Sequence, residues 1–477
     1  MTYETAVFLE TPRLPAAGPT DRDRWALRIL QFGGLAVVLA ATTYKAFELD
    51  RFFLPKELTL HLTALGAGLL AARTFRRTPF TRVDLLLVLY LLLGLIGTIF
   101  ATNVWAALRA LTVSASGVAI FWAARAMRTA ELDRPLLMAL ALAVVLGAVT
   151  SCLQAYGIRT DLFSINRAPG GTLGNRNFVA HMAAFGLPVV LLAALNARRA
   201  SGFLIGALGA TIVATTLVLT RSRAGWLASG AVLLVWLLAM VAAPPLRRDG
   251  RTWRRFTGIL AGAALGVLAA VFLPNALRWR SENPYLESIR GVANFQEGSG
   301  RGRVVQYRRS LRMTLEHPLL GVGPGNWAVE YPKYAARRDP SMNRSQPGTT
   351  ANPWPSSDWV ASVSERGPIA TILIILALAG IAWRGLLQLR AAQTPGDGLA
   401  AAALLGTLLA VAVAGMFDAV LLLALPTLLV WAILGALWLP PETSEFDASR
   451  TRSDALIAVA ILAGLGAVRS ASQLTAA

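Results

Sequence analysis

The sequence predicts an all-α protein that crosses a membrane with about 12 helices and carries one large loop on one side. Composition is the first reason: 55% of the 477 residues are hydrophobic, 15% are charged, and the mean hydropathy is +0.55. A water-soluble domain with this balance would expose too much apolar surface. The apolar residues also form long runs, and arginines concentrate in the short polar stretches between these runs.

Twelve segments have the composition of a membrane-spanning helix, which needs about 20 largely apolar residues. We predict spans at residues 26–44, 57–72, 83–101, 104–124, 135–156, 177–195, 202–219, 224–243, 256–274, 367–384, 398–417 and 419–438. The shorter run 454–468 is either a thirteenth span or a helix at the membrane interface. The first 24 residues lack the apolar core of a signal peptide, so we expect the first segment to stay as a helix.

These spans divide the chain into five regions. We expect a cytoplasmic, disordered tail rich in Pro, Thr and Asp at residues 1–25. The other regions are an N-terminal bundle of nine spans at 26–274, a large loop at 275–366, further spans at 367–438, and a cytoplasmic linker with the possible last helix at 439–477.

Arginine placement predicts the orientation, because cytoplasmic loops of membrane proteins are enriched in Lys and Arg. With a cytoplasmic N-terminus, every second loop carries such residues: Arg73, Arg76, Arg77, Arg82, Arg125, Arg128, Arg134, Arg198, Arg199, Arg247, Arg248, Arg251, Arg254, Arg255, Arg384 and Arg390. The short loops at 45–56 and 102–103 show no such excess. The loop 275–366 is therefore expected outside the cytoplasm, where its own arginines need another explanation, such as binding an anion.

The net charge of +19 does not indicate a nucleic-acid partner, since loop arginines beside anionic lipid headgroups account for most of it. The single Cys152 excludes a disulfide framework within the chain. Three histidines are too few for a histidine-rich metal site, and we expect neither a metal nor another cofactor. The expected partners are membrane lipids and an anionic ligand.

The longest polar interval, residues 301–367, contains the strongest candidate site. From Arg303 to Leu315 apolar residues recur at helical spacing between arginines, which predicts a basic amphipathic helix. Pro318 should end it, and Gly321–Gly325 should form a tight turn. This helix either rests on lipid headgroups or presents its arginines to an anionic ligand.

Three other polar positions lie near the predicted outer ends of spans. Arg221 and Arg223 form a possible phosphate clamp, although Arg221 can also extend to the membrane surface. The stretch 170–177 has glycines that permit close backbone approach, with Asn177 as the expected N-cap of the next helix. Asp418, between two apolar spans, is expected to be a residue of an outer turn in preference to a proton carrier.

Four motifs together resemble the O-antigen ligase/polymerase superfamily. They are GTLGNRNF at 171–178, TRSRAGWL at 220–227, RVVQYRRSLRMTLEHPLLGVGPGNW at 303–327 and DWVASVSERG at 358–367. The resemblance implies a lipid-dependent (GT-C-like) glycosyltransferase fold in the bacterial inner membrane, with a periplasmic loop over the active site. It also implies inverting, metal-independent transfer of a glycan from an undecaprenyl-type diphosphate carrier to an acceptor such as lipopolysaccharide or a growing polysaccharide.

The resemblance also implies roles for particular residues. Arg223 and Arg303 match the arginines that hold the donor diphosphate, with Arg221 beside them. Possible further substrate contacts are Asn175, Asn177 and Glu365.

The sequence departs from the family at the expected catalytic base. Family members carry a His nine residues before the Glu of Glu-x-Gly, and this position is Ser356. A serine hydroxyl is not a general base near neutral pH, so Asp358, two residues away, is the predicted replacement. Asp358 could equally be a helix cap or a solvated loop acid, and His317 is the only histidine expected on the outer face.

The alternative is a membrane protein that binds lipid-linked glycans without catalysis, having lost the family's base. A transporter is disfavoured, because transporters place polar features near the bilayer midplane, whereas here they gather at one face. The sequence does not distinguish a ligase from a polymerase.

Overall fold

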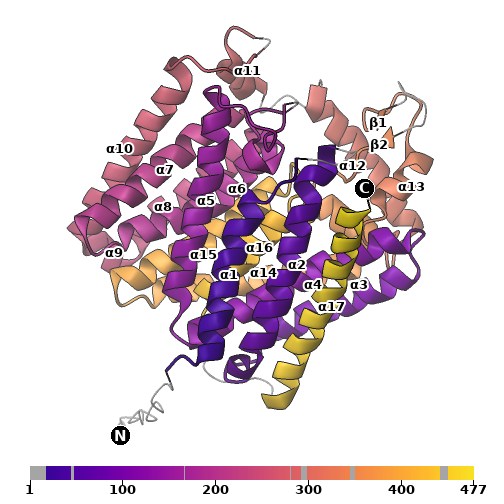
Figure 1. Ribbon diagram of the computed structural model, residues 1–477, viewed down its shortest axis with the longest axis horizontal. Coiled ribbons are helices and arrows are strands. Elements are labelled where there is room, and N and C mark those ends of the chain that lie inside the picture. The colour runs from indigo at the N-terminus through magenta and orange to yellow at the C-terminus, as the bar shows by residue number, and fades with distance from the viewer. Residues whose placement is uncertain are drawn as a thin grey trace, which may run out of the picture.

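The computed structural model describes residues 18–43, 48–165, 167–279, 281–291, 298–343, 350–440 and 449–476. Long helices run between the two ends of the molecule, and smaller elements cover one of these ends (Figure 1). In the described part, 11 helices are long and apolar enough to cross a membrane. The predicted all-α, multi-pass bundle is therefore confirmed.

The long helices of the bundle alternate in direction. They are α1 (Asp21–Leu39), α2 (Glu48–Phe75), α3 (Arg82–Ile99), α4 (Val104–Thr129), α5 (Asp133–Ala155), α6 (Arg176–Leu195), α7 (Ala200–Thr220), α8 (Arg223–Ala242), α10 (Gly250–Phe272), α14 (Asp358–Arg390), α15 (Pro395–Ala414), α16 (Ala424–Leu437) and α17 (Ser449–Thr475). The short helix α9 (Pro244–Arg248) joins α8 to α10.

The remaining elements lie between α10 and α14 and pack at one end of the bundle, here called the loop end (Figure 1). They are α11 (Pro284–Arg290), α12 (Gly298–Glu316), α13 (Trp327–Tyr334) and the paired strands β1 (Met342–Asn343) and β2 (Thr350–Ala351). A short 3₁₀ helix, η1 (Gly171–Leu173), precedes α6. The C-terminal end of α17 lies at the loop end, and α1 begins at the opposite end (Figure 1).

Ten of the twelve predicted spans coincide with long apolar helices, and α17 supplies the eleventh. The short run at 454–468 is thus part of a 27-residue helix rather than an isolated segment. The predicted last full span, 419–438, is wrong in length, because α16 has 14 residues. All 14 are buried by neighbouring helices, so this helix contacts protein along its whole length.

The prediction for residues 1–25 needs correction at its end. Helix α1 begins at Asp21, because Thr20 and Asp23 form a capping box that satisfies free N–H groups of the first turn. Its charged first turn keeps α1 outside the group of 11 apolar helices. Residues 1–17 of the expected tail, and residues 441–448 of the expected linker, lie outside the described part.

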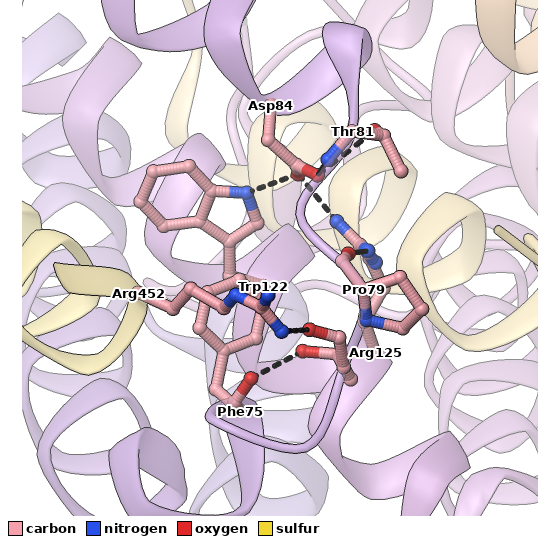
Figure 2. Close-up of polar contacts among 8 residues, drawn as sticks. Phe75, Pro79, Thr81, Asp84, Trp122, Arg125 and Arg452 are labelled. Carbon is pink, nitrogen blue, oxygen red and sulfur yellow. Dashed lines mark hydrogen bonds and ion pairs between the residues drawn. The ribbon is translucent and has the colours of Figure 1, made fainter. Parts of the chain in front are cut away.

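The end opposite the loop end contains a buried ion pair, here called the Asp84 cluster (Thr81, Asp84, Trp122 and Arg125). Figure 2 shows the Trp122 indole and the Arg125 guanidinium both directed at the Asp84 carboxylate. Thr81 donates its backbone N–H and its hydroxyl to the other carboxylate oxygen, at 2.8 and 2.9 Å. Arg125 also donates to the carbonyl of Pro79 at 2.7 Å. These bonds compensate two charges that are almost completely removed from water.

The loop end is held together by two glycine turns that touch. Gly321 and Gly367 have φ of +65° and +79°, a backbone region that residues with a Cβ rarely adopt. A Cβ on Gly367 would collide with the carbonyl oxygen of Leu319, and one on Gly321 would collide with the backbone of Glu365. Val322 N–H donates to the carbonyl of Ser364 at 2.9 Å. The third and fourth sequence motifs therefore form one packed unit, and the predicted tight turn is confirmed.

Candidate functional site

A cavity of about 560 Å³ lies at the loop end, here called the loop-end cavity. Its wall combines polar side chains with aromatic ones from α2, α6, α12 and the segment before α14. The lining includes Phe53, Arg167, Asn175, Asn177, Phe178, Arg303, Trp354, Ser356 and Asp418. The rings of Phe53, Phe178 and Trp354 pack against one another, with centroids 5.5 to 6.3 Å apart.

A second cavity of about 1190 Å³ adjoins the first. Both are lined by Arg167, Asn175 and Asn177, so they are two parts of one groove at the loop end. The second part adds Arg159, Arg176, Arg221 and Arg278, against the carboxylates of Asp161 and Glu287. The groove is therefore predominantly cationic, which favours an anionic ligand.

Arg303 on α12 is the predicted diphosphate residue that lines the loop-end cavity. Its Nε donates to the carbonyl of Phe417 at 2.9 Å, and this bond fixes the position of the guanidinium. Helix α12 covers 298–316 and ends before Pro318, as the sequence predicted. Its inner face buries Gln306, Ser310 and Met313, while Leu311 and Leu315 are exposed. The same helix can therefore meet a lipid surface and supply an arginine to the cavity.

Arg223 does not line either part of the groove. Its guanidinium donates to the carbonyl of Gly291 and lies near enough to Arg303 for the two charges to repel each other. The two predicted arginines are thus close enough to interact electrostatically, but only Arg303 lines the cavity.

Arg221 lines the second part of the groove and is held by α11. Its Nε donates to Ser288 Oγ at 2.8 Å, its Nη2 lies 3.3 Å from Glu287, and the guanidinium stacks over Trp279. It also ends α7 in the left-handed conformation, with φ of +53°. These contacts make Arg221 part of the groove wall.

Asn175, and not Asn177, is the N-cap of α6. Its side chain accepts the N–H of Asn177 at 3.0 Å, because the extended backbone at 175 points the amide back over the first turn. Asn177 is in the first turn of α6 and lines the cavity, as Asn175 does. The two predicted contact residues are therefore together in the groove.

Ser356, the predicted counterpart of the family's histidine, also lines the cavity. Its N–H donates to Gln306 Oε1 at 2.6 Å, and its carbonyl lies 2.7 Å from the hydroxyl of Tyr307. Burial raises the pKa of Tyr307 to about 12, so this phenol stays protonated near neutral pH and cannot replace the histidine as a base.

Asp358 begins α14 and does not line the loop-end cavity. Its carboxylate accepts the N–H of Leu421 at 2.9 Å, and its backbone N–H donates to the carbonyl of Gly415 at 2.8 Å. The side chain is 7% exposed and is not part of the cavity wall. Asp358 therefore connects α14 to the turn between α15 and α16.

Glu365 lies inside the packed glycine turns. Its two carboxylate oxygens accept the N–H groups of Gly325 at 2.9 Å and Trp327 at 3.3 Å. It is buried and does not line the groove. This position explains why the fourth motif contains a carboxylate, because Glu365 holds the turn that leads into α13.

Sequence reasoning missed the placement of Asp418 and His181. Asp418 was expected to be a turn residue and not a proton carrier, but it lines the cavity, and its carboxylate lies 3.9 Å from His181 Nε2. His181 comes from α6, so His317 is not the only histidine near this face. One signal was available: His181 follows Asn177 by four residues, which places both on one face of a helix.

The described residues contain no group of three or more His, Cys, Asp or Glu side chains arranged to hold a metal ion. The positive charge of the groove comes from its arginines.

A bundle with 11 long apolar helices in the described part defines the class, a multi-pass membrane protein, and the groove at its loop end is cationic and partly aromatic. Residues 208–375 match the family model described as O-antigen ligase. This match supports the chain's membership of the O-antigen ligase/polymerase superfamily, and it includes the second, third and fourth of the four motifs. No curated protein matches the sequence. The matched region includes Arg223, Arg303 and Ser356 and ends before Asp418.

Proposed function

We propose that this protein transfers a glycan from a polyprenyl-diphosphate carrier to an acceptor glycan or lipid, at the periplasmic face of a bacterial inner membrane. The O-antigen ligase match supports an activity of the ligase or polymerase type. The observation that carries the finer proposal is Arg303, fixed at a cavity that also has polar and aromatic walls.

The proposed reaction inverts the anomeric carbon. A hydroxyl of the acceptor attacks this carbon from the face opposite the diphosphate, and the bond from the carbon to the diphosphate oxygen breaks. Negative charge then accumulates on the leaving diphosphate. Arg303, with Arg223 nearby and Arg221 in the adjoining groove, stabilises this charge, since fixed guanidiniums in a site shielded from water are strong partners for phosphate oxygens.

An apolar groove supports a lipid-linked donor. A cavity of about 620 Å³ runs between α8, α14, α15 and α16, lined almost entirely by aliphatic side chains. At its loop end are Trp359, the residue after Asp358, and Leu421, whose N–H donates to Asp358. A polyprenyl chain in this groove would have its diphosphate at the loop end, near the arginines.

Asn175 and Asn177 are proposed to bind the glycan or the diphosphate, because their amides line both parts of the groove. Glu365 is proposed to contribute to substrate binding indirectly, by holding the turn at Gly325 in place. The acceptor hydroxyl must lose a proton, and Ser356 is not a base. Two carboxylates are near Ser356: Asp358, which the sequence pattern favoured, and Asp418 in the cavity wall.

The second candidate function is binding of a lipid-linked glycan without transfer. Ser356 favours it, because the residue at the family's catalytic position lacks a basic group. Both functions use the same groove and differ only in turnover.

The test is a deletion strain in which the full-length protein is restored from a plasmid. We expect the deletion to accumulate lipid-linked glycan in membrane lipid extracts, measured by mass spectrometry, and the wild-type plasmid to remove it. Arg303→Ala should fail to remove it at equal expression. The control is Arg308→Ala on the same helix, an exposed arginine outside the groove, which should remove it fully. If the deletion leaves lipid-linked glycans unchanged, the transferase proposal is wrong.

A further inference from the structure

We infer that Asp418 is the group that accepts the proton of the attacking hydroxyl, and that His181 positions its carboxylate. This inference rests on the proposed transferase function. It assigns the base to a turn between α15 and α16, 62 residues beyond the position where the family carries its histidine.

The first argument is access. A general base must reach the proton that it removes, directly or through one water. Among the described residues that line the loop-end cavity, Asp418 is the only carboxylate, and none of the others is a histidine, lysine or tyrosine. Its side chain is 16% exposed, so it can meet a ligand there.

The second argument is that the Asp418 carboxylate is not neutralised by a cation. In the described part of the chain it forms no ion pair with an arginine or lysine. Oδ1 accepts the N–H of the next residue, Ala419, at 3.0 Å. The nearby Arg303 uses its Nε on the carbonyl of Phe417 instead. A carboxylate paired by an arginine would be a poor base, and Asp418 is free of that pairing.

The third argument comes from His181. Its side chain is 1% exposed, and neither ring nitrogen has a hydrogen-bond partner among the described residues. A buried polar group without a partner destabilises a fold and calls for an explanation. The ring stacks on Phe185, and Nε2 lies 3.9 Å from Asp418 Oδ2. An approach of about 1 Å would form an N–H···O bond that fixes one oxygen of Asp418.

The fourth argument is that the turn carrying Asp418 is braced on several sides. Arg303 donates to the carbonyl of Phe417, and the Tyr307 hydroxyl lies 2.7 Å from the carbonyl of Met416. Asp358 accepts the N–H of Leu421 at 2.9 Å. The residue that holds the leaving diphosphate thus also holds the segment that carries the base. Because Arg303 and Asp418 are held together, both can contact one bound substrate, as catalysis by orientation requires.

Asp358 fits this arrangement as a brace and not as the base. The oxygen that does not bind Leu421 is buried without a partner in the described chain, against Gly415. An acceptor hydroxyl in the loop-end cavity would have to displace the turn to reach it. Asp418 lies on the cavity side of the same turn.

In the proposed step the acceptor O–H proton moves to the carboxylate of Asp418 as the new C–O bond forms. The bond from the anomeric carbon to the diphosphate oxygen breaks at the same time, and its electron pair leaves with the polyprenyl diphosphate. Asp418 then returns the proton to the departing diphosphate or to water. His181 stays neutral throughout and donates from Nε2.

The experiment uses the purified full-length protein and, as donor and acceptor source, a detergent-solubilised lipid extract of the deletion strain. We expect Asp418→Asn to lower the rate of glycan transfer at least about 100-fold, the usual effect of losing a general base. Binding of undecaprenyl diphosphate, used as the probe, should stay within about threefold of wild type. The matched control is Asp397→Asn, an exposed carboxylate at the opposite end of α15, which should transfer at the wild-type rate.

Chemical rescue separates a base from a structural carboxylate. Asp418→Ala leaves space beside a cavity of about 560 Å³, and added formate should restore at least about tenfold of the lost transfer rate. Transfer within about threefold of wild type in Asp418→Asn would overturn the inference. So would loss of transfer in Asp358→Asn alongside full activity in Asp418→Asn.

Two variants test whether His181 acts through its N–H donor. His181→Gln keeps an N–H near the position of Nε2, and His181→Leu keeps much of the volume without it. We expect His181→Leu to lower kcat by about 10- to 100-fold, the worth of one hydrogen bond to a charged group, with KM unchanged. His181→Gln should retain most of kcat. Equal losses in both variants would assign His181 a packing role only.

These outcomes are distinct from failure of the proposed function. If the wild-type protein converts none of the extracted donor while still binding undecaprenyl diphosphate, the binding function holds and both the transferase proposal and this inference are wrong. If wild type converts the donor and Asp418→Asn does so equally well, only this inference is wrong.

Discussion

The Asp84 cluster and the Asp418–His181 pair are polar groups at opposite ends of the same bundle, and they differ in how completely they are paired. The Asp84–Arg125 ion pair is fully buried, whereas Asp418 is partly open to the loop-end cavity. Each oxygen of Asp84 accepts two hydrogen bonds, from Trp122 and Arg125 on one side and from Thr81 on the other (Figure 2). Asp418 accepts one bond, from its own neighbour Ala419, and the nearby His181 has none in the described chain.

The difference separates a structural charge from a reactive one. A buried carboxylate that is fully bonded contributes to stability and has no lone pair available for a substrate. A carboxylate with free acceptor sites at a cavity is costly for the fold, and such strain persists where a ligand is to be bound. The same residue type therefore has opposite roles at the two ends of the bundle.

We predict that the two ends of the bundle face different compartments. In intact cells, a cysteine at the loop end should therefore be labelled and a cysteine at the other end should not. In a background with Cys152→Ala, a cysteine at Glu282 before α11 should react with a membrane-impermeant thiol reagent in intact cells. A cysteine at Arg248 in α9 should react only after the membrane is opened. The reverse pattern would place the groove on the cytoplasmic side and refute the periplasmic assignment.

The next largest contrast is between folding and turnover. Asp84→Ala leaves the Arg125 charge buried without its partner, and breaking such a pair costs about 3–5 kcal/mol. We expect little folded protein, measured by size-exclusion chromatography in detergent. Asp418→Ala should instead give wild-type amounts of folded protein. Comparable losses of folded protein in both variants would remove the distinction between the two carboxylates.

Arg303 should show a large effect on transfer with folding intact. Arg303→Ala removes a guanidinium from the leaving diphosphate, and we expect the transfer rate to fall about 10²–10³-fold, as for other single electrostatic contacts to developing charge. Arg303→Lys keeps the charge but loses the planar fork, so it should recover only part of the rate. Full activity of Arg303→Lys would show that charge alone suffices.

The smallest expected effect concerns Tyr307, which braces the Asp418 turn. Its pKa is raised by burial to about 12, so the folded state favours the neutral phenol. Its stabilising contribution is complete below the ordinary pKa of about 10 and is lost as the pH rises through about 12. Thermal stability of the wild type should therefore fall between these values, and Tyr307→Phe should lack this component. Identical pH profiles would exclude a coupling of Tyr307 ionisation to folding.

The placement of Asp358 depends on contacts that its sequence position does not show. Its distance of two residues from Ser356 made it the natural replacement for the missing histidine. The first turn of α14 directs its side chain to Leu421 instead of the cavity. Chain distance does not determine which side of a helix faces a ligand when the helix axis is set by contacts elsewhere.

The sequence by itself determined the helical, multi-pass class, most of the spans, the helix at Arg303 and the turn at Gly321–Gly325. It also predicted that the arginines of every second short loop between spans lie at the same end of the bundle. Each of these follows from local properties: apolar length, periodicity, and the backbone freedom of glycine. The tertiary structure alone brought Arg303 of α12 and the turn at Asp418 to one cavity, with His181 of α6 buried next to Asp418. These residues are separated by more than 100 positions from one to the next, and the packing of whole helices, which no local pattern encodes, decides which of their side chains meet.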